Sequence, residues 1–144
     1  MFSKEESKKL RQEFWIAFGK SYPRKWILYN TRIKGLQFKF DFDVKKARVA
    51  MDVDTDNLER RILLWEKLIS LKSILTDEYW PEAIFDDSYL LENGKEISRI
   101  YLEKDNVSIH NKNSWQETMQ FLDANMKQLE AFFLEYKDII DNLE

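Results

Sequence analysis

Residues 36–54 alternate between apolar and polar side chains so regularly that they predict one structure, a β-hairpin with one buried face. The apolar residues are Leu36, Phe38, Phe40, Phe42 and Val44 in the first run and Ala47, Val49, Met51 and Val53 in the second. Successive side chains of a strand point to opposite faces of the sheet, so each apolar set lies on a single face. The pattern therefore predicts two antiparallel strands that cover a hydrophobic core.

The register of this hairpin follows from burial more than from charge. A tip at residues 45–46 pairs Phe42 with Val49 on the buried face. The charged pairs on the other face, which we expect to be solvated, are Asp43 with Arg48 and Lys39 with Asp52. Burying one large side chain contributes roughly 1.5–3 kcal/mol, whereas a cross-strand charge pair contributes about 0.2–1 kcal/mol. The phenylalanines therefore decide the predicted register, and the charges agree with it.

Residues 114–144 predict a long C-terminal helix. Large apolar residues recur there in unbroken steps of four and three, the spacing of one helix face. The stripe consists of Trp115, Met119, Leu122, Met126, Leu129, Phe133, Tyr136, Ile140 and Leu143. Ser114 and Glu117 have the spacing of a capping box, in which each side chain bonds the other residue's free backbone N–H. We expect this helix to lie along a whole face of the domain or to project from it.

Two more helices are predicted before it. Residues 3–19 have Ser3 and Glu6 in capping-box spacing, and residues 56–75 open with the same spacing at Asp56 and Glu59. The second of these helices carries two neighbouring apolar stripes, which are Leu58, Ile62, Trp65 and Ile69, and Leu64, Leu68, Leu71 and Leu75. A helix with so broad an apolar surface is expected to be covered on more than one side.

The remaining strands are shorter. Residues 26–29 are rich in strand-forming side chains, and Asn93-Gly94 predicts a type I′ turn between strands at 83–91 and 96–103. We expect a bulge in that hairpin, because regular pairing would place Asp87 opposite Ile100, and a further short strand at 107–109. The fold class is therefore α+β, a single domain over residues 1–144 in which an antiparallel sheet of five to six strands packs against three helices.

Composition excludes several classes of protein. The chain has no cysteine, so disulfides, thiolate catalysis and cysteine-ligated zinc are ruled out. The first residues are charged where a signal peptide needs an apolar segment, and no run of 18 apolar residues occurs. We therefore expect a cytoplasmic protein without a membrane-spanning segment.

Several short motifs together resemble one known family. They are Trp26-x-x-Tyr29-Asn30-Thr31, Ala47-Arg48-Val49, Glu92-Asn93-Gly94-Lys95 with Ile97-Ser98-Arg99-Ile100-Tyr101-Leu102, and Asn111-Lys112-Asn113-x-Trp115. Over nearly its whole length the chain resembles a bacterial family catalogued as domain of unknown function 4268. Longer members of that family look as if this module follows a nuclease-like domain, which implies a nucleic-acid or defence context. The resemblance implies no catalytic or binding residues.

No reactive constellation emerges from the residues themselves. His110 is the only histidine and lacks a second ligand or triad partner at a suitable spacing. The aspartates at 41, 43, 52 and 54 suggest a cation site, but a solvated sheet face with paired charges explains them better. Asp43-Val44-Lys45 has the literal spacing of a nuclease motif, but its lysine falls at the predicted hairpin tip. We therefore expect no catalytic, cofactor-binding or metal-binding residues and no cofactor.

Residues 20–48 offer a candidate nucleic-acid surface. They contain nine basic residues and two acidic ones, a balance of +7 that leaves −10 for the rest of a chain whose net charge is −3. Basic side chains interleaved with aromatic rings suit single-stranded nucleic acid. The candidate residues are Arg24, Lys25, Trp26, Tyr29, Arg32 and Lys34. The alternative, which the acidic remainder of the chain favours, is that Trp26 belongs to the core and the lysines keep a sheet edge soluble.

The C-terminal helix offers a candidate self-association surface. Besides its main stripe it carries Phe121, Phe132 and Ile139, more apolar surface than one sheet face covers. The alternative is that the two earlier helices bury these side chains within one subunit. The sequence thus predicts a non-enzymatic binding domain whose partner is a protein, with self-association as the leading hypothesis. An accessory module for nucleic-acid transactions that uses residues 20–48 is the alternative.

Overall fold

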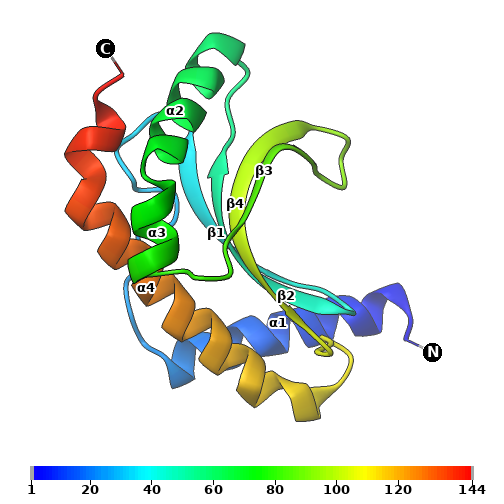
Figure 1. Ribbon diagram of the computed structural model, residues 1–144. Coiled ribbons are helices and arrows are strands. Elements are labelled where there is room, and N and C mark those ends of the chain that lie inside the picture. The colour runs from blue at the N-terminus through cyan, green and yellow to red at the C-terminus, as the bar shows by residue number, and fades with distance from the viewer. Residues whose placement is uncertain (1, 144) are drawn as a thin grey trace.

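A four-stranded antiparallel sheet in the order β1-β2-β4-β3 forms the centre of the computed structural model, which describes residues 2–143 (Figure 1). Two hairpins supply the strands, and the second strand of each hairpin lies in the middle of the sheet. In chain order the elements are α1 (Lys4–Ser21), β1 (Leu36–Phe42), β2 (Lys46–Val53), α2 (Leu58–Ser70), α3 (Lys72–Glu78), β3 (Ile84–Leu90), β4 (Glu96–Asp105), a 3₁₀ turn (Lys112–Ser114) and α4 (Trp115–Asp141).

The α+β class, the antiparallel sheet and the long C-terminal helix are confirmed, but the number of elements was predicted incorrectly. Residues 2–143 contain four strands and four α-helices, in place of five to six strands and three helices. Residues 26–29 and 107–109 do not form strands. Leu28 has a positive φ of 44°, and the Ile27 N–H donates to the carboxylate of Glu130 at 2.6 Å. A contact with α4 therefore overrides the strand preference of these residues.

The predicted second helix is two helices. It breaks at Leu71, whose ψ of 7° leaves the helical range, and α3 continues from Lys72. The cap of α2 is Asn57, whose side chain accepts from the Arg60 N–H at 3.1 Å, and not the predicted Asp56. The capping box at Ser3 and Glu6 is confirmed.

The capping box predicted for the last helix is wrong. Ser114 is the N-cap of α4 but makes no cap hydrogen bond with its side chain. Its hydroxyl instead donates to the carbonyl groups of Ser108 and Asn111. The Ser114 hydroxyl therefore bonds the loop before α4 and does not cap the helix.

The first hairpin has the predicted faces but a different register. Phe42 pairs with Ala47 and Phe40 with Val49, so every partner is displaced by two residues from the prediction. The turn is displaced because the Asp43 carboxylate accepts the N–H groups of Lys45 and Lys46, both at 2.8 Å. A displacement of two residues keeps each side chain on its own face. The buried phenylalanine face therefore survives the change.

The second hairpin is closed by three residues, 92–94, and not by the predicted type I′ turn. The Leu91 N–H donates to the Lys95 carbonyl, and Gly94 has a φ of +88°. A three-residue loop with glycine in the left-handed region is the next most common hairpin connection. The expected bulge is present between Asp86 and Tyr89. It bends the hairpin, which in Figure 1 curls away from the helices.

The helices cover one face of the sheet. Buried side chains of β1, β2 and β4, such as Phe38, Met51 and Ile100, form one cluster with those of the helices. Phe38 packs against Phe133 of α4 with the ring centroids 5.2 Å apart. Among residues 2–143 no helix covers the opposite face of the sheet, on the side where the β3–β4 hairpin bends outward (Figure 1). We call this opposite side the open face.

Candidate functional site

A buried ion pair lies at the centre of the open face. Asp52 of β2 and Arg99 of β4 are directly opposite each other in the sheet, and their exposed fractions are 0% and 2%. The Arg99 guanidinium donates to both carboxylate oxygens of Asp52, from Nε at 2.7 Å and from Nη2 at 2.8 Å. This bidentate geometry is the strongest arrangement of the two groups.

Further side chains from the two outer strands, β1 and β3, complete this cluster. Arg99 Nη1 also donates to Asp41 Oδ2 of β1 at 3.0 Å, and Lys39 Nζ lies 3.6 Å from Asp52 Oδ2. The Tyr89 ring, placed on this face by the bulge in β3, covers the guanidinium with its centroid 4.3 Å away. We call Lys39, Asp41, Asp52, Tyr89 and Arg99 the charged cluster.

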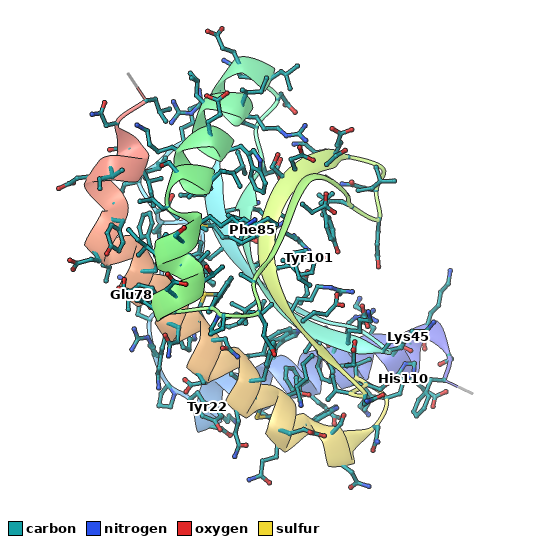
Figure 2. All side chains as sticks on the ribbon, viewed as in Figure 1. Tyr22, Lys45, Glu78, Phe85, Tyr101 and His110 are labelled. Carbon is teal, nitrogen blue, oxygen red and sulfur yellow. The ribbon has the colours of Figure 1, made fainter. Side chains whose placement is uncertain are left out.

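A second group of ion pairs follows β2 toward the hairpin turn. Arg48 donates from Nε to Glu103 at 2.8 Å and from Nη1 to Asp43 at 3.1 Å. Lys46 bonds the other oxygen of Glu103 at 2.8 Å. Figure 2 shows Lys45 at this end of the sheet and Tyr101 on β4. Opposite charges are therefore matched along the whole open face.

The environment shifts the proton affinities of these carboxyl groups in opposite directions. Burial raises the pKa of Asp52 above its ordinary value, and it outweighs the hydrogen bonds from Arg99 that favour the charged form. Burial alone would also raise the pKa of Glu103, but hydrogen bonds from Lys46 and Arg48 outweigh it and lower the pKa. The carboxyl group inside the cluster therefore has its charged form disfavoured by burial, whereas the charged form of Glu103 is stabilised by its cationic partners.

A cleft of about 730 Å³ lies over the charged cluster. Lys39, Asp41, Arg48 and Arg99 contribute to its wall from the sheet, and residues 89–93 of the β3–β4 hairpin close the other side. Arg11 of α1 lines it as well. The volume lies within the range of ordinary ligand pockets, about 300–1,000 Å³.

The carboxylates of the cleft floor are held in ion pairs. Asp41 pairs with Arg99 and Asp43 with Arg48, and the described residues that line the cleft include neither serine nor histidine. The Ser7 hydroxyl does lie 2.8 Å from His110 Nε2, but that pair joins α1 to the loop before α4, and the ring of Phe2 stacks on His110. Within residues 2–143 no group of three histidine, aspartate or glutamate side chains is arranged to hold a metal ion.

The candidate nucleic-acid residues lie on the loop between α1 and β1, and the loop uses two of them internally. Arg24 donates to the buried carboxylate of Glu130 at 2.8 Å. Trp26 stands against Phe18 and Phe40, with the Arg24 guanidinium 5.0 Å from its ring centroid. Lys25, Tyr29, Arg32 and Lys34 are exposed, and so is Arg24 despite its ion pair, with 43% of its side chain accessible.

The candidate self-association residues are not equally accessible. Phe132 is buried within the subunit against Tyr79, with ring centroids 5.5 Å apart. Phe121 is half-buried, and Ile139 is exposed. Leu134 is the other large apolar side chain that α4 exposes, but Glu135 and Asp138 lie between it and Ile139. No continuous apolar stripe on α4 therefore faces solvent.

A continuous exposed stripe is present on α2. Leu58, Ile62 and Ile69 are all exposed, and the half-buried Trp65 completes the spacing between them. The parallel stripe that includes Leu64 and Leu68 is buried in the core. The expectation that both stripes are covered is therefore met for one stripe only within the described chain. We call Leu58, Ile62, Trp65 and Ile69 the α2 stripe.

The charged cluster was not predicted from the sequence, and the expectation that this face is solvated was wrong. Asp52 and Arg99 are buried, and Asp41 and Lys39 are partly so. One signal was present. Ser98 and Arg99 interrupt an otherwise apolar run at 97–102, and an arginine at the centre of a strand that lies inside a sheet requires a buried acidic partner.

Comparison with known proteins identifies the family but no activity. No curated protein and no solved structure matches the chain. None of the helices in residues 2–143 has both the length and the apolar character needed to cross a membrane. The model of the family described as Domain of unknown function (DUF4268) matches residues 10–137, which confirms the resemblance, and the chain therefore belongs to that family.

Proposed function

We propose that this chain is a non-enzymatic interaction domain that associates with a second copy of itself through the α2 stripe. The observation that carries the proposal is the exposure of three large aliphatic side chains in a line on one helix. Scattered exposed apolar residues are ordinary, whereas a continuous row of them is typical of an interaction site.

The spacing of the stripe favours a second copy as the partner. The steps from Leu58 to Ile62, Trp65 and Ile69 are four, three and four residues, which reads the same in both directions. When two copies pack antiparallel about a twofold axis, Leu58 therefore faces Ile69 and Ile62 faces Trp65. A twofold interface requires such a self-complementary surface.

The expected dimer is weak. Complete burial of Leu or Ile contributes roughly 1.5–3 kcal/mol, and these side chains are already partly covered, so each contributes less than that. Association also costs translational and rotational freedom, which offsets part of the burial. Association is therefore expected to depend strongly on concentration.

Sedimentation equilibrium between about 10 μM and about 1 mM tests the proposal, because interactions of about 4–7 kcal/mol are half-saturated there. Ile62 and Ile139 are a matched pair, each 47% exposed and each on a helix. We expect Ile62→Lys to remain monomeric, and Ile139→Lys to associate like the unchanged protein. The reverse result moves the interface to α4, as the sequence had suggested. An unchanged protein that is monomeric throughout the range contradicts the proposed function.

The geometry supports the nucleic-acid alternative less well. The loop exposes Lys25, Tyr29, Arg32 and Lys34, which could contact a polyanion. Arg24 and Trp26, however, hold the loop to the body of the domain. Self-association therefore remains the function that the surface supports best.

A further inference from the structure

The cleft over the charged cluster has more hydrogen-bond donors than the protein uses. A guanidinium carries five N–H groups, and Arg48 donates two of them, to Glu103 and Asp43. Lys39 approaches a carboxylate no closer than 3.6 Å among the described residues. Both side chains line the cleft. An anionic oxygen placed there would therefore receive hydrogen bonds that the protein leaves unmade.

The same wall offers carboxylate acceptors, and Asp41 is the one directly opposite Arg48 in the sheet. Asp41 Oδ2 accepts a hydrogen bond from Arg99, and over residues 2–143 no hydrogen bond to Asp41 Oδ1 is found. The Asp41 side chain is 36% exposed and lines the cleft. It can therefore accept an N–H from a ligand whose anionic group bonds Lys39 and Arg48.

The rim of the cleft is apolar. Leu90 on the β3–β4 hairpin and Val44 at the opposite hairpin turn are 68% and 49% exposed, and both line the cleft. Apolar side chains exposed on both sides of a pocket favour a ligand with an aliphatic group. A ligand that fits therefore combines an anion, a nearby N–H donor and an aliphatic part.

The charge of the cleft limits how many negative groups the ligand carries. Arg11, Lys39, Arg48 and Arg99 face a wall that also holds Asp41, Asp43 and Glu92, so the balance of these seven residues is +1. A chain of phosphates would meet three carboxylates. Asp52 lies under the floor and pairs with Arg99 and Lys39, so a single carboxylate is the anion that adds the least negative charge, and the planar guanidinium group of Arg48 suits its geometry.

We propose that this cleft binds the C-terminus of a peptide whose last residues are aliphatic. Its carboxylate accepts hydrogen bonds from Lys39 and Arg48, the N–H of the last residue donates to Asp41, and the aliphatic side chains contact Leu90 and Val44. The buried ion pair of Asp52 and Arg99 holds together the strands that form the floor of the cleft. The site shares no residue with the α2 stripe, so it does not depend on self-association.

Titration of ¹⁵N-labelled protein with three probes, followed by NMR, tests this proposal. The probes are acetyl-Gly-Leu-Leu with a free carboxylate, the same peptide with a C-terminal amide, and 4-methylpentanoate, an aliphatic carboxylate without a peptide N–H. We expect the free acid to shift the backbone amides of Lys39, Arg48 and Leu90. The amide should bind at least about tenfold more weakly, since it loses a charge-assisted hydrogen bond.

Two lysines provide a matched comparison in the same titration. Lys39 lines the cleft and Lys104 does not, and their side chains are 24% and 30% exposed. Lys39→Gln should weaken binding of the free acid about tenfold, whereas Lys104→Gln should leave it unchanged.

Four results would overturn the proposal. Equal binding of acid and amide removes the role of the carboxylate, and absence of any shift at millimolar peptide removes the site. Equal affinity for 4-methylpentanoate assigns the cleft to small aliphatic carboxylates in place of a peptide. A short oligonucleotide that shifts these amides when the peptide does not assigns the cleft to nucleic acid.

Discussion

Replacing Arg99 by methionine measures how strongly the buried ion pair stabilises the open face. The change removes three hydrogen bonds, two to Asp52 and one to Asp41, and leaves the Asp52 carboxylate buried. Removing one partner of a buried pair typically costs about 3–5 kcal/mol, because the remaining charge loses its compensation. For a chain of this length that corresponds to a fall in Tm of about 10–15 °C.

The loss of stability caused by Arg99→Met should depend on pH. Burial already raises the pKa of Asp52, and Arg99 opposes that rise, so the pKa rises further when Arg99 is removed. An acid whose pKa is higher in the folded state than in the unfolded state binds more protons when folded. The stability of the variant therefore increases as the pH falls through the raised pKa of Asp52. The difference from the unchanged protein should be largest at neutral pH and smaller in acid.

Urea unfolding followed by tryptophan fluorescence, at about pH 7 and about pH 5, checks both statements. Arg11→Met is the matched control, since Arg11 is exposed, and a surface substitution of this kind usually changes stability by less than about 0.5 kcal/mol. A loss below about 1 kcal/mol for Arg99→Met would show that the ion pair contributes little. A loss that stays the same at both pH values would contradict the role assigned to Asp52.

Two further predictions concern the loop between α1 and β1. Glu130→Gln should lower the free energy of unfolding by about 1–3 kcal/mol and speed hydrogen exchange at the Ile27 amide, whose N–H donates to Glu130 at 2.6 Å. Glu135→Gln, at an exposed position on the same helix, should change neither quantity. Unaltered exchange in Glu130→Gln would refute the anchoring role. A fluorescent single-stranded oligonucleotide should show no salt-dependent change in anisotropy with the protein; a change that Tyr29→Ala removes would establish the nucleic-acid alternative.

The first hairpin shows which part of a sheet the sequence predicts reliably. The alternation over residues 36–54 assigned the side chains of both strands to the correct faces, because a period of two places alternate residues on opposite faces. Val44, which was predicted on the buried face, lies in the turn and is 49% exposed. The register was wrong because the Asp43 carboxylate binds the two backbone N–H groups of Lys45 and Lys46 and so places the turn. Such a local side-chain contact competes with pairing energies that differ little between registers.

Residues 26–29 show the limit set by distant contacts. Their side chains favour a strand, but the Glu130 carboxylate, 103 residues away, accepts the Ile27 N–H. Leu28 then adopts a positive φ, and its carbonyl accepts the N–H of Phe38 at 3.0 Å. No periodicity within the loop reveals this arrangement. It depends on where α4 crosses the sheet.

The charged cluster could not be recognised for a related reason. Asp52 and Arg99 lie 47 residues apart, and each is compatible with a solvated strand when it is considered alone. Only the position of β4 beside β2 brings them together. The Tyr89 ring of β3 then covers the guanidinium, and this depends on a bulge whose existence, but not whose direction, was predicted.

The order of the strands also sets how this chain must fold. Both β2 and β3 pair with β4, so the first hairpin cannot find its neighbour until Asp105 has left the ribosome. Pairs in β2 and β4 lie 45 to 59 residues apart in the chain, from Val53 with Ser98 to Lys46 with Asp105, and such pairings are slow to form because a long loop must close before they contribute. Early intermediates should therefore display β2 as a temporary edge, with Asp52 still hydrated. Chaperones that recognise unpaired strands have their best opportunity in that interval.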